Sequence, residues 1–99
     1  MSSYVFGSAA LDDLLDIWKY IAEDSEAAAD RWLERLYGEV EMLASRPGMG
    51  HRRRDLTARD VLFWPVSGYL VLYRARPSLI EVVAVTQGSR DIPRLLGTR

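Results

Sequence analysis

Residues 61–74 read VLFWPVSGYLVLYR, two runs of apolar and aromatic side chains joined by a Ser-Gly pair. Runs of this composition on either side of a two-residue turn predict a β-hairpin. A third run, at residues 80–86, follows a Pro-Ser turn and extends the hairpin to a meander of three strands. The two later strands are apolar at nearly every position, which indicates that both faces of the sheet are covered.

Two amphipathic helices are predicted upstream of this meander. In residues 8–22, apolar side chains recur at the spacing of one helical face, and Ser8 is placed to cap the start. A second apolar stripe runs through residues 26–45, with Asp24 or Ser25 as its N-cap, and Pro47 prevents its continuation. Because only a few residues separate the two helices, we expect an antiparallel helical hairpin.

The remaining elements are short. Residues 4–6 form an aromatic and β-branched run typical of a strand, and residues 91–96 are compatible with a final helical turn. The order β-α-α-β-β-β(-α) predicts an α+β fold, with the helical hairpin packed on one face of an antiparallel sheet. With 99 residues, the chain has room for a single domain, residues 1–99.

The charge is divided between the two halves of the chain. The total is 13 basic against 14 acidic residues, a net charge of −1. Residues 1–45 carry a net charge of −7, whereas residues 46–99 carry ten arginines against four acids, a net of +6. The near-zero total therefore conceals an acidic helical half and an arginine-rich half that is suited to contacts with acidic partners.

Composition excludes several chemistries. There is no cysteine and only one histidine, His51, so thiol nucleophiles, disulfides and Cys- or His-based metal sites are not expected. Nothing in the sequence calls for a cofactor. No apolar run reaches the roughly 18 residues needed to cross a bilayer, so we expect a cytoplasmic protein without membrane contacts.

Charged clusters supply the first candidates for function. The carboxylates of Asp12, Asp13 and Asp16 are interpreted as a solvated helix face rather than a site. Residues 46–54 hold four arginines and are predicted to contact a macromolecule, either nucleic acid or protein. Catalysis by His51 is not favoured, because Asp55 is the only nearby carboxylate that could orient it.

Aromatic side chains and the segment after the last strand supply the others. Most of the aromatic residues lie on apolar stripes and are assigned to the core, but Tyr20 and Tyr37 lie off the main stripe and mark a partner surface. After the last strand, Arg90 and Asp91 either pair locally and cap the final turn or contact a partner.

Several motifs, in order and spacing, resemble one protein family. They are A-x-x-D-L-x-x-I-x-x-Y-I at 10–21, L-x-x-x-P-x-x-G-x-x-x-R-x-L at 43–56, G-Y-L-V-L-Y-R at 68–74, I-x-V-x-x-V at 80–85 and G-S-R-D-I at 88–92. Together they resemble the RelE/ParE superfamily of small bacterial toxins from type II toxin–antitoxin modules. The resemblance spans about residues 4–96.

The superfamily contains two activities, and the sequence favours one of them. RelE-like members resemble ribosome-dependent mRNA endonucleases, which need an acid, a base and cations around the phosphate. Arg53, Arg54 and Arg74 could supply cations. However, Gln87 and the two residues after it do not titrate usefully where nuclease members tend to place Tyr or His.

The resemblance to ParE-like members implies a toxin without catalytic residues that inhibits DNA gyrase by binding it. Many ParE proteins have a His at the position of Gln87, so this chain departs from their pattern there. The residues implied for the target contact are Arg90, Asp91, Ile92, Arg94 and Leu95.

The resemblance also implies a cognate antitoxin, a small DNA-binding protein with an amphipathic tail that wraps the toxin. We expect it to contact Tyr20, Tyr37, Arg53, Arg54 and Arg74. Direct nucleic-acid binding is not expected on this interpretation. The alternatives are a RelE-type mRNA endonuclease and a non-toxic, antitoxin-bound corepressor.

Overall fold

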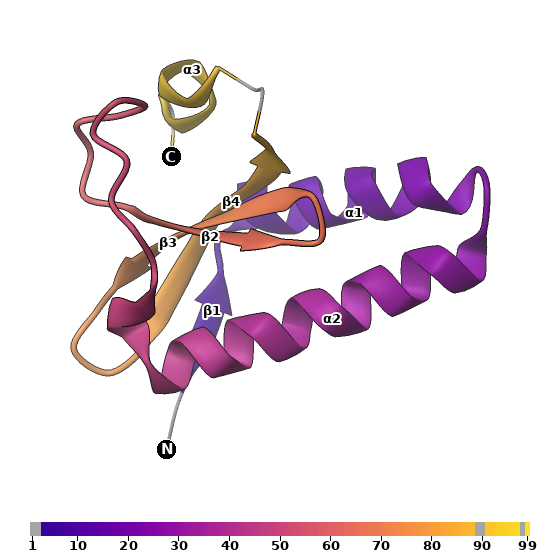
Figure 1. Ribbon diagram of the computed structural model, residues 1–99, viewed down its shortest axis with the longest axis horizontal. Coiled ribbons are helices and arrows are strands. Elements are labelled where there is room, and N and C mark those ends of the chain that lie inside the picture. Colours follow the sequence, from indigo (N-terminus) through magenta and orange to yellow (C-terminus); the bar gives the residue numbers. More distant parts are fainter. Residues whose placement is uncertain (1–2, 89–90, 98) are drawn as a thin grey trace.

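The helices and strands follow one another in the order that the sequence predicts (Figure 1). The computed structural model describes residues 3–88, 91–97 and 99. Its elements are β1 (Tyr4–Phe6), α1 (Ser8–Ala22), α2 (Glu26–Ser45), the 3-10 turn η1 (Pro47–Met49), β2 (Leu62–Val66), β3 (Tyr69–Ala75), β4 (Ile80–Gln87) and α3 (Ile92–Leu96). Within the described residues, no helix is both long and apolar enough to span a membrane.

The four strands form one sheet in the order β1-β4-β3-β2. The expected antiparallel pairing holds for β2 with β3 and for β3 with β4. Strand β1 joins the other side of β4 in the parallel sense, with Tyr4 opposite Ile80 and Phe6 opposite Val82. Parallel pairing is possible because a long connection, and not a tight turn, separates β1 from β4. The α+β class predicted from the sequence is confirmed.

The N-cap of α2 is the predicted residue, whereas the N-cap of α1 is not. Ser25 caps α2 by accepting a hydrogen bond from the Ala28 N–H at 3.1 Å, as predicted. Ser8 does not cap α1, because it is already the first helical residue and extended Gly7 takes the cap position without a side-chain bond. The Gly7 N–H donates instead to the Val82 carbonyl at 2.9 Å, which fastens the start of α1 to β4.

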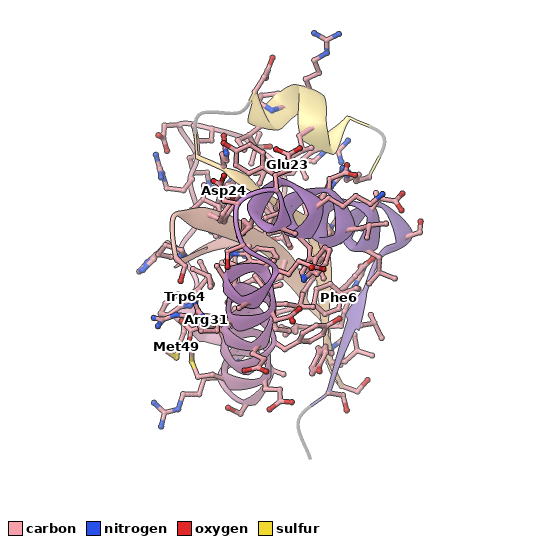
Figure 2. All side chains as sticks on the ribbon, turned by 90° about the vertical axis from the view of Figure 1, so that its right-hand side faces the viewer. Phe6, Glu23, Asp24, Arg31, Met49 and Trp64 are labelled. Carbon is pink, nitrogen blue, oxygen red and sulfur yellow. The ribbon has the colours of Figure 1, made fainter. Side chains whose placement is uncertain are left out.

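Both faces of the sheet are covered, as the apolar character of β3 and β4 predicts. One face packs against α1 and α2 through Leu14, Leu36, Val71 and their neighbours. The other face carries a second cluster in which Phe63, Leu72 and Ala84 meet the short helix α3. Figure 2 shows the hairpin from its turn at Glu23 and Asp24, with α3 at the top of the view.

A buried tyrosine fixes the corner between α2 and β2. The Tyr73 side chain is fully buried, and its hydroxyl donates to the Pro47 carbonyl at 2.7 Å and accepts from the Gly50 N–H at 2.9 Å. A Cβ atom at Gly50 would lie 2.5 Å from that hydroxyl. Glycine is therefore required at position 50 for close approach to the tyrosine.

Candidate functional site

The arginine-rich loop between η1 and β2 neutralises part of its own charge. Arg53 donates two hydrogen bonds to Asp55, at 3.0 and 2.8 Å, and Arg52 pairs with Asp60. These hydrogen bonds are the main reason that the pKa values of Asp55 and Asp60 lie below the usual range. Two of the loop's cations are therefore engaged within the loop itself.

Two further arginines act on Asp60 through their charge alone. Arg54 and Arg74 make smaller contributions that also lower the pKa of Asp60. Arg74 projects from β3, and its guanidinium donates to the Arg99 carbonyl at 3.4 Å. Arg53 is held by Asp55 within the loop, and a role of Arg53, Arg54 and Arg74 in antitoxin binding stays a prediction.

His51 lies at the start of the same loop, and among the described residues no hydrogen bond or ion pair joins its imidazole to a carboxylate. Its backbone pairs with Phe63, and its ring stacks on Trp64 with centroids 6.4 Å apart. Asp55, the only carboxylate that the sequence offered as its partner, is bound to Arg53. This arrangement gives His51 a packing contact rather than the geometry of a general base.

The predicted target-binding segment divides into buried and exposed residues. Asp91 caps α3 by accepting from the Arg94 N–H at 3.4 Å, while the Asp91 and Arg94 side chains are exposed. Leu95 is partly buried against the second cluster. Ile92 is only 1% exposed, so its selection as a contact residue is corrected: it anchors α3 to the sheet. Arg90 lies outside the described residues.

The two tyrosines expected on a partner surface have different environments. Tyr37 is half-buried on α2 and packs against Phe6, with ring centroids 5.5 Å apart, and against Tyr4. Tyr20 is 64% exposed on α1. Tyr20 is therefore the residue of the pair that is free to meet a partner.

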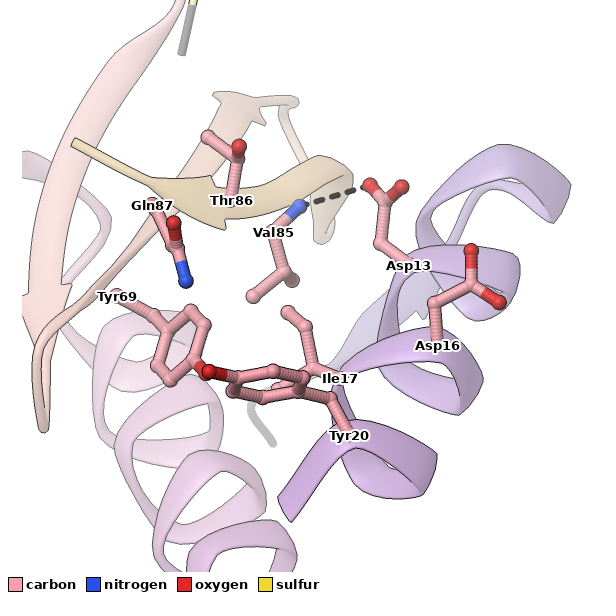
Figure 3. Close-up of a pocket in the computed structure, with 8 residues that line it drawn as sticks. All are labelled: Asp13, Asp16, Ile17, Tyr20, Tyr69, Val85, Thr86 and Gln87. Atoms are coloured by element: carbon pink, nitrogen blue, oxygen red, sulfur yellow. Dashed lines mark hydrogen bonds between the residues drawn. The ribbon is translucent and has the colours of Figure 1, made fainter. Parts of the chain in front are cut away.

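A pocket of about 230 Å³ lies between α1 and the ends of β3 and β4 (Figure 3). Tyr20 and Tyr69 contribute aromatic rings to it, and Ile17 and Val85 contribute apolar side chains. The polar side chains that line it are those of Asp13, Asp16, Thr86 and Gln87. Neither Arg54 nor Arg74 lines this pocket, so it is acidic in character.

The role of Asp13 is a correction to the sequence analysis. Its side chain is 16% exposed and accepts from the Val85 N–H at 3.0 Å. It also forms a two-point ion pair with Arg99, at 2.6 and 3.1 Å. Sequence reasoning assigned Asp13 to the solvated face, although its spacing of three from Ala10 and four from Ile17 places it on the inner stripe of α1.

Comparisons with known proteins agree with this architecture. A family model described as "ParE toxin of type II toxin-antitoxin system, parDE" matches residues 4–92. The curated protein Toxin RelE3 of Caulobacter vibrioides is 24% identical over 85 residues, covering 86% of this chain and 92% of that protein.

Two solved structures share the fold at 17% sequence identity. One belongs to the chromosomal ParDE system of P. aeruginosa, with a TM-score of 0.72 over 88% of this chain and 96% of that chain. The other belongs to the RelBE2 toxin–antitoxin complex of Mycobacterium tuberculosis, with a TM-score of 0.55 over 87% and 96%. From the family match over residues 4–92, the chain belongs to the ParE toxin family of type II toxin–antitoxin systems, within the RelE/ParE superfamily.

Proposed function

We propose that this toxin acts by binding and inhibiting DNA gyrase, without catalytic groups of its own, and that a cognate antitoxin neutralises it. The proposal treats residues 1–99 as one toxin domain. Its main support is the chemistry at the end of β4, where Thr86 and Gln87 line a pocket together with the carboxylates of Asp13 and Asp16. Cleavage of RNA needs cations around the scissile phosphate. The carboxylate of Asp16, which no ion pair among the described residues compensates, opposes the approach of a phosphate to this pocket.

The environments of Tyr73 and His51 also favour binding over cleavage. Burial raises the pKa of Tyr73, whose hydroxyl is engaged by Pro47 and Gly50, so it is a poor base near neutral pH. The imidazole of His51 stacks on Trp64. The exposed arginines of the loop supply charge for binding an acidic partner but cannot exchange a proton at physiological pH.

The alternative activity is that of a ribosome-dependent mRNA endonuclease, which the name of the relative Toxin RelE3 favours. Two assays on the purified toxin separate the activities. We expect inhibition of gyrase supercoiling and intact mRNA on ribosomes in a toeprint assay. Cleaved message with normal supercoiling would overturn the proposal in favour of the endonuclease.

The third hypothesis is that the protein is a non-toxic corepressor that acts while bound to the antitoxin. Expression of the toxin alone, from a tightly controlled promoter, tests it: we expect growth arrest that is relieved when the protein encoded by the adjacent gene is co-expressed. Normal growth with the folded toxin present would favour the corepressor. We place both encounters, with the antitoxin and with gyrase, in the cytoplasm.

A further inference from the structure

The pocket between α1, the start of β3 and the end of β4 has a size and lining suited to a single side chain, and we call it the socket. Its volume of about 230 Å³ lies below the range of about 300–1,000 Å³ that is usual for small-molecule sites. Ile17 and Val85 are suited to contact an aliphatic stem, while the two tyrosine rings lie on one side of the pocket and the carboxylates of Asp13 and Asp16 on another. Such a lining fits a long side chain with a charged end.

The charge of the lining determines whether a positive or a negative side chain is favoured in the pocket. Asp13 is already compensated by Arg99, but among the described residues no ion pair or hydrogen bond engages the exposed carboxylate of Asp16. The surrounding half of the chain, residues 1–45, carries a net charge of −7. A cation is therefore favoured in this pocket and an anion is opposed.

The tyrosines select the shape of the cation. Tyr20, 64% exposed, and Tyr69 both line the pocket, and the face of a tyrosine ring attracts a cation through its quadrupole. A guanidinium group is planar, so it can stack on a ring while it donates hydrogen bonds to the Asp16 carboxylate. Lysine offers the charge without the stacking plane.

From these three features, we infer that the pocket formed by Asp16, Ile17, Tyr20, Tyr69 and Gln87 binds an arginine side chain presented by the tail of the antitoxin. The identity of the partner rests on the proposed function, whereas the chemistry of the socket rests on its lining alone. The same tail would place acidic side chains against Arg54 and Arg74, whose charges both act on Asp60. The two contacts, of opposite sign, would fix the direction in which the tail runs over the toxin.

The socket is tested first without the antitoxin. N-acetyl-arginine amide is titrated into the full-length toxin and followed by amide NMR, with N-acetyl-citrulline amide as the uncharged analogue of the same shape. We expect saturable shifts at residues 16–20, 69 and 85–87 with the arginine probe only. Asp16→Asn weakens its binding about fivefold or more, whereas Asp12→Asn, at an exposed carboxylate outside the pocket, does not. Equal shifts with both probes, or no effect of Asp16→Asn, overturn the inference.

The partner is tested next, in the complex with the protein encoded by the adjacent gene. We expect Asp16→Lys to raise its dissociation constant about tenfold or more, and Asp12→Lys to change it less than about twofold. If that protein binds wild type and Asp16→Lys equally, the inference fails while the proposed function stands. If it does not bind wild type at all, the proposed partner fails, and the result with the arginine probe still decides the socket.

Two other occupants give distinct results. If Asp16→Lys keeps its antitoxin affinity but no longer inhibits gyrase, the socket belongs to the target. If Asp16→Lys instead abolishes a toxin dimer seen by sedimentation, a second copy of the chain occupies it. Either result overturns the assignment to the antitoxin.

Discussion

Asp13 and Arg99, 86 positions apart, form an ion pair that ties the first helix to the end of the described chain. Each side chain is 16% exposed. The pair is continued by hydrogen bonds to the backbone of β4, from Val85 N–H to Asp13 and from Arg99 to the Val83 carbonyl at 3.1 Å. One carboxylate therefore fastens the helical layer, the central strand and the C-terminal segment at a single point.

We expect Asp13→Ala to destabilise the fold. It leaves the Val85 N–H without its acceptor and removes the carboxylate that neutralises the largely buried Arg99 guanidinium, which keeps its bond to the Val83 carbonyl. The expected loss is about 1–3 kcal/mol in the free energy of unfolding, measured by urea denaturation. Asp12→Ala is the matched control, because Asp12 is the adjacent carboxylate on α1 and its side chain is exposed. Equal midpoints for Asp13→Ala and Asp12→Ala would show that the pair contributes nothing.

The C-terminal segment should separate structural from binding residues. Ile92→Ala opens a cavity in the second cluster and is expected to cost about 2–5 kcal/mol, measured by thermal or urea unfolding. Arg94→Glu changes an exposed side chain and should leave stability within about 0.5 kcal/mol of wild type. On the proposed function, Arg94→Glu nevertheless weakens gyrase inhibition.

Because the C-terminal segment contains both buried and exposed residues, deleting it would not test binding alone. Deleting residues 91–99 would remove Ile92, Leu96 and the partner of Asp13, and would uncover Phe63 and Leu72. Loss of toxicity after such a deletion would report unfolding, so the point substitution is the informative experiment. Normal gyrase inhibition by a stable Arg94→Glu variant would remove this side chain from the proposed target contact.

The fold could be predicted from periodicity because each core-forming segment carries its own pattern. The apolar stripe of α2 and the continuous apolar runs of β3 and β4 are local signals, and the coverage of both sheet faces follows from them. The parallel pairing of β1 with β4 has no such signal, because a three-residue strand does not specify its neighbour. The buried face of α1 is also narrower than the spacing of its apolar residues predicts, because Leu11 and Leu15 remain 48% and 50% exposed.

The candidate site could be predicted only in part, for a related reason. An arginine cluster is visible in one stretch of sequence, but the sequence does not show that Asp55 binds Arg53 and that Asp60, eight positions away, binds Arg52. The acidic pocket is lined by residues of α1, β3 and β4, so no single sequence motif predicts it. Asp13 was misassigned because a carboxylate on an inner helical stripe is stable only with a partner such as Arg99, which lies far away in the chain.

Gly50→Ala should be destabilising where Gly48→Ala is not. A Cβ at position 50 would lie 2.5 Å from the hydroxyl of buried Tyr73, whereas a Cβ at position 48 would meet nothing within 4 Å. Relief of the first clash requires the corner after η1 to move, at an expected cost of about 1–3 kcal/mol. Urea denaturation of both variants measures it, and similar losses for the two would contradict the close approach.

Tyr73 should make stability fall in alkaline solution. Burial disfavours the phenolate, so the pKa of Tyr73 is raised in the folded state above the value of about 10 for an unfolded chain. The folded state thus holds the proton more tightly. The resulting contribution to stability is fully present below about pH 10 and is lost as the pH rises through the raised pKa.

The comparison with Tyr73→Phe isolates this contribution, because phenylalanine keeps the ring but has no proton to release. The stability advantage of wild type over Tyr73→Phe, measured by urea unfolding at several pH values, should be constant near neutral pH and shrink above about pH 10. If wild type and Tyr73→Phe lose stability in parallel, the hydroxyl held between Pro47 and Gly50 does not govern the alkaline limit of the fold.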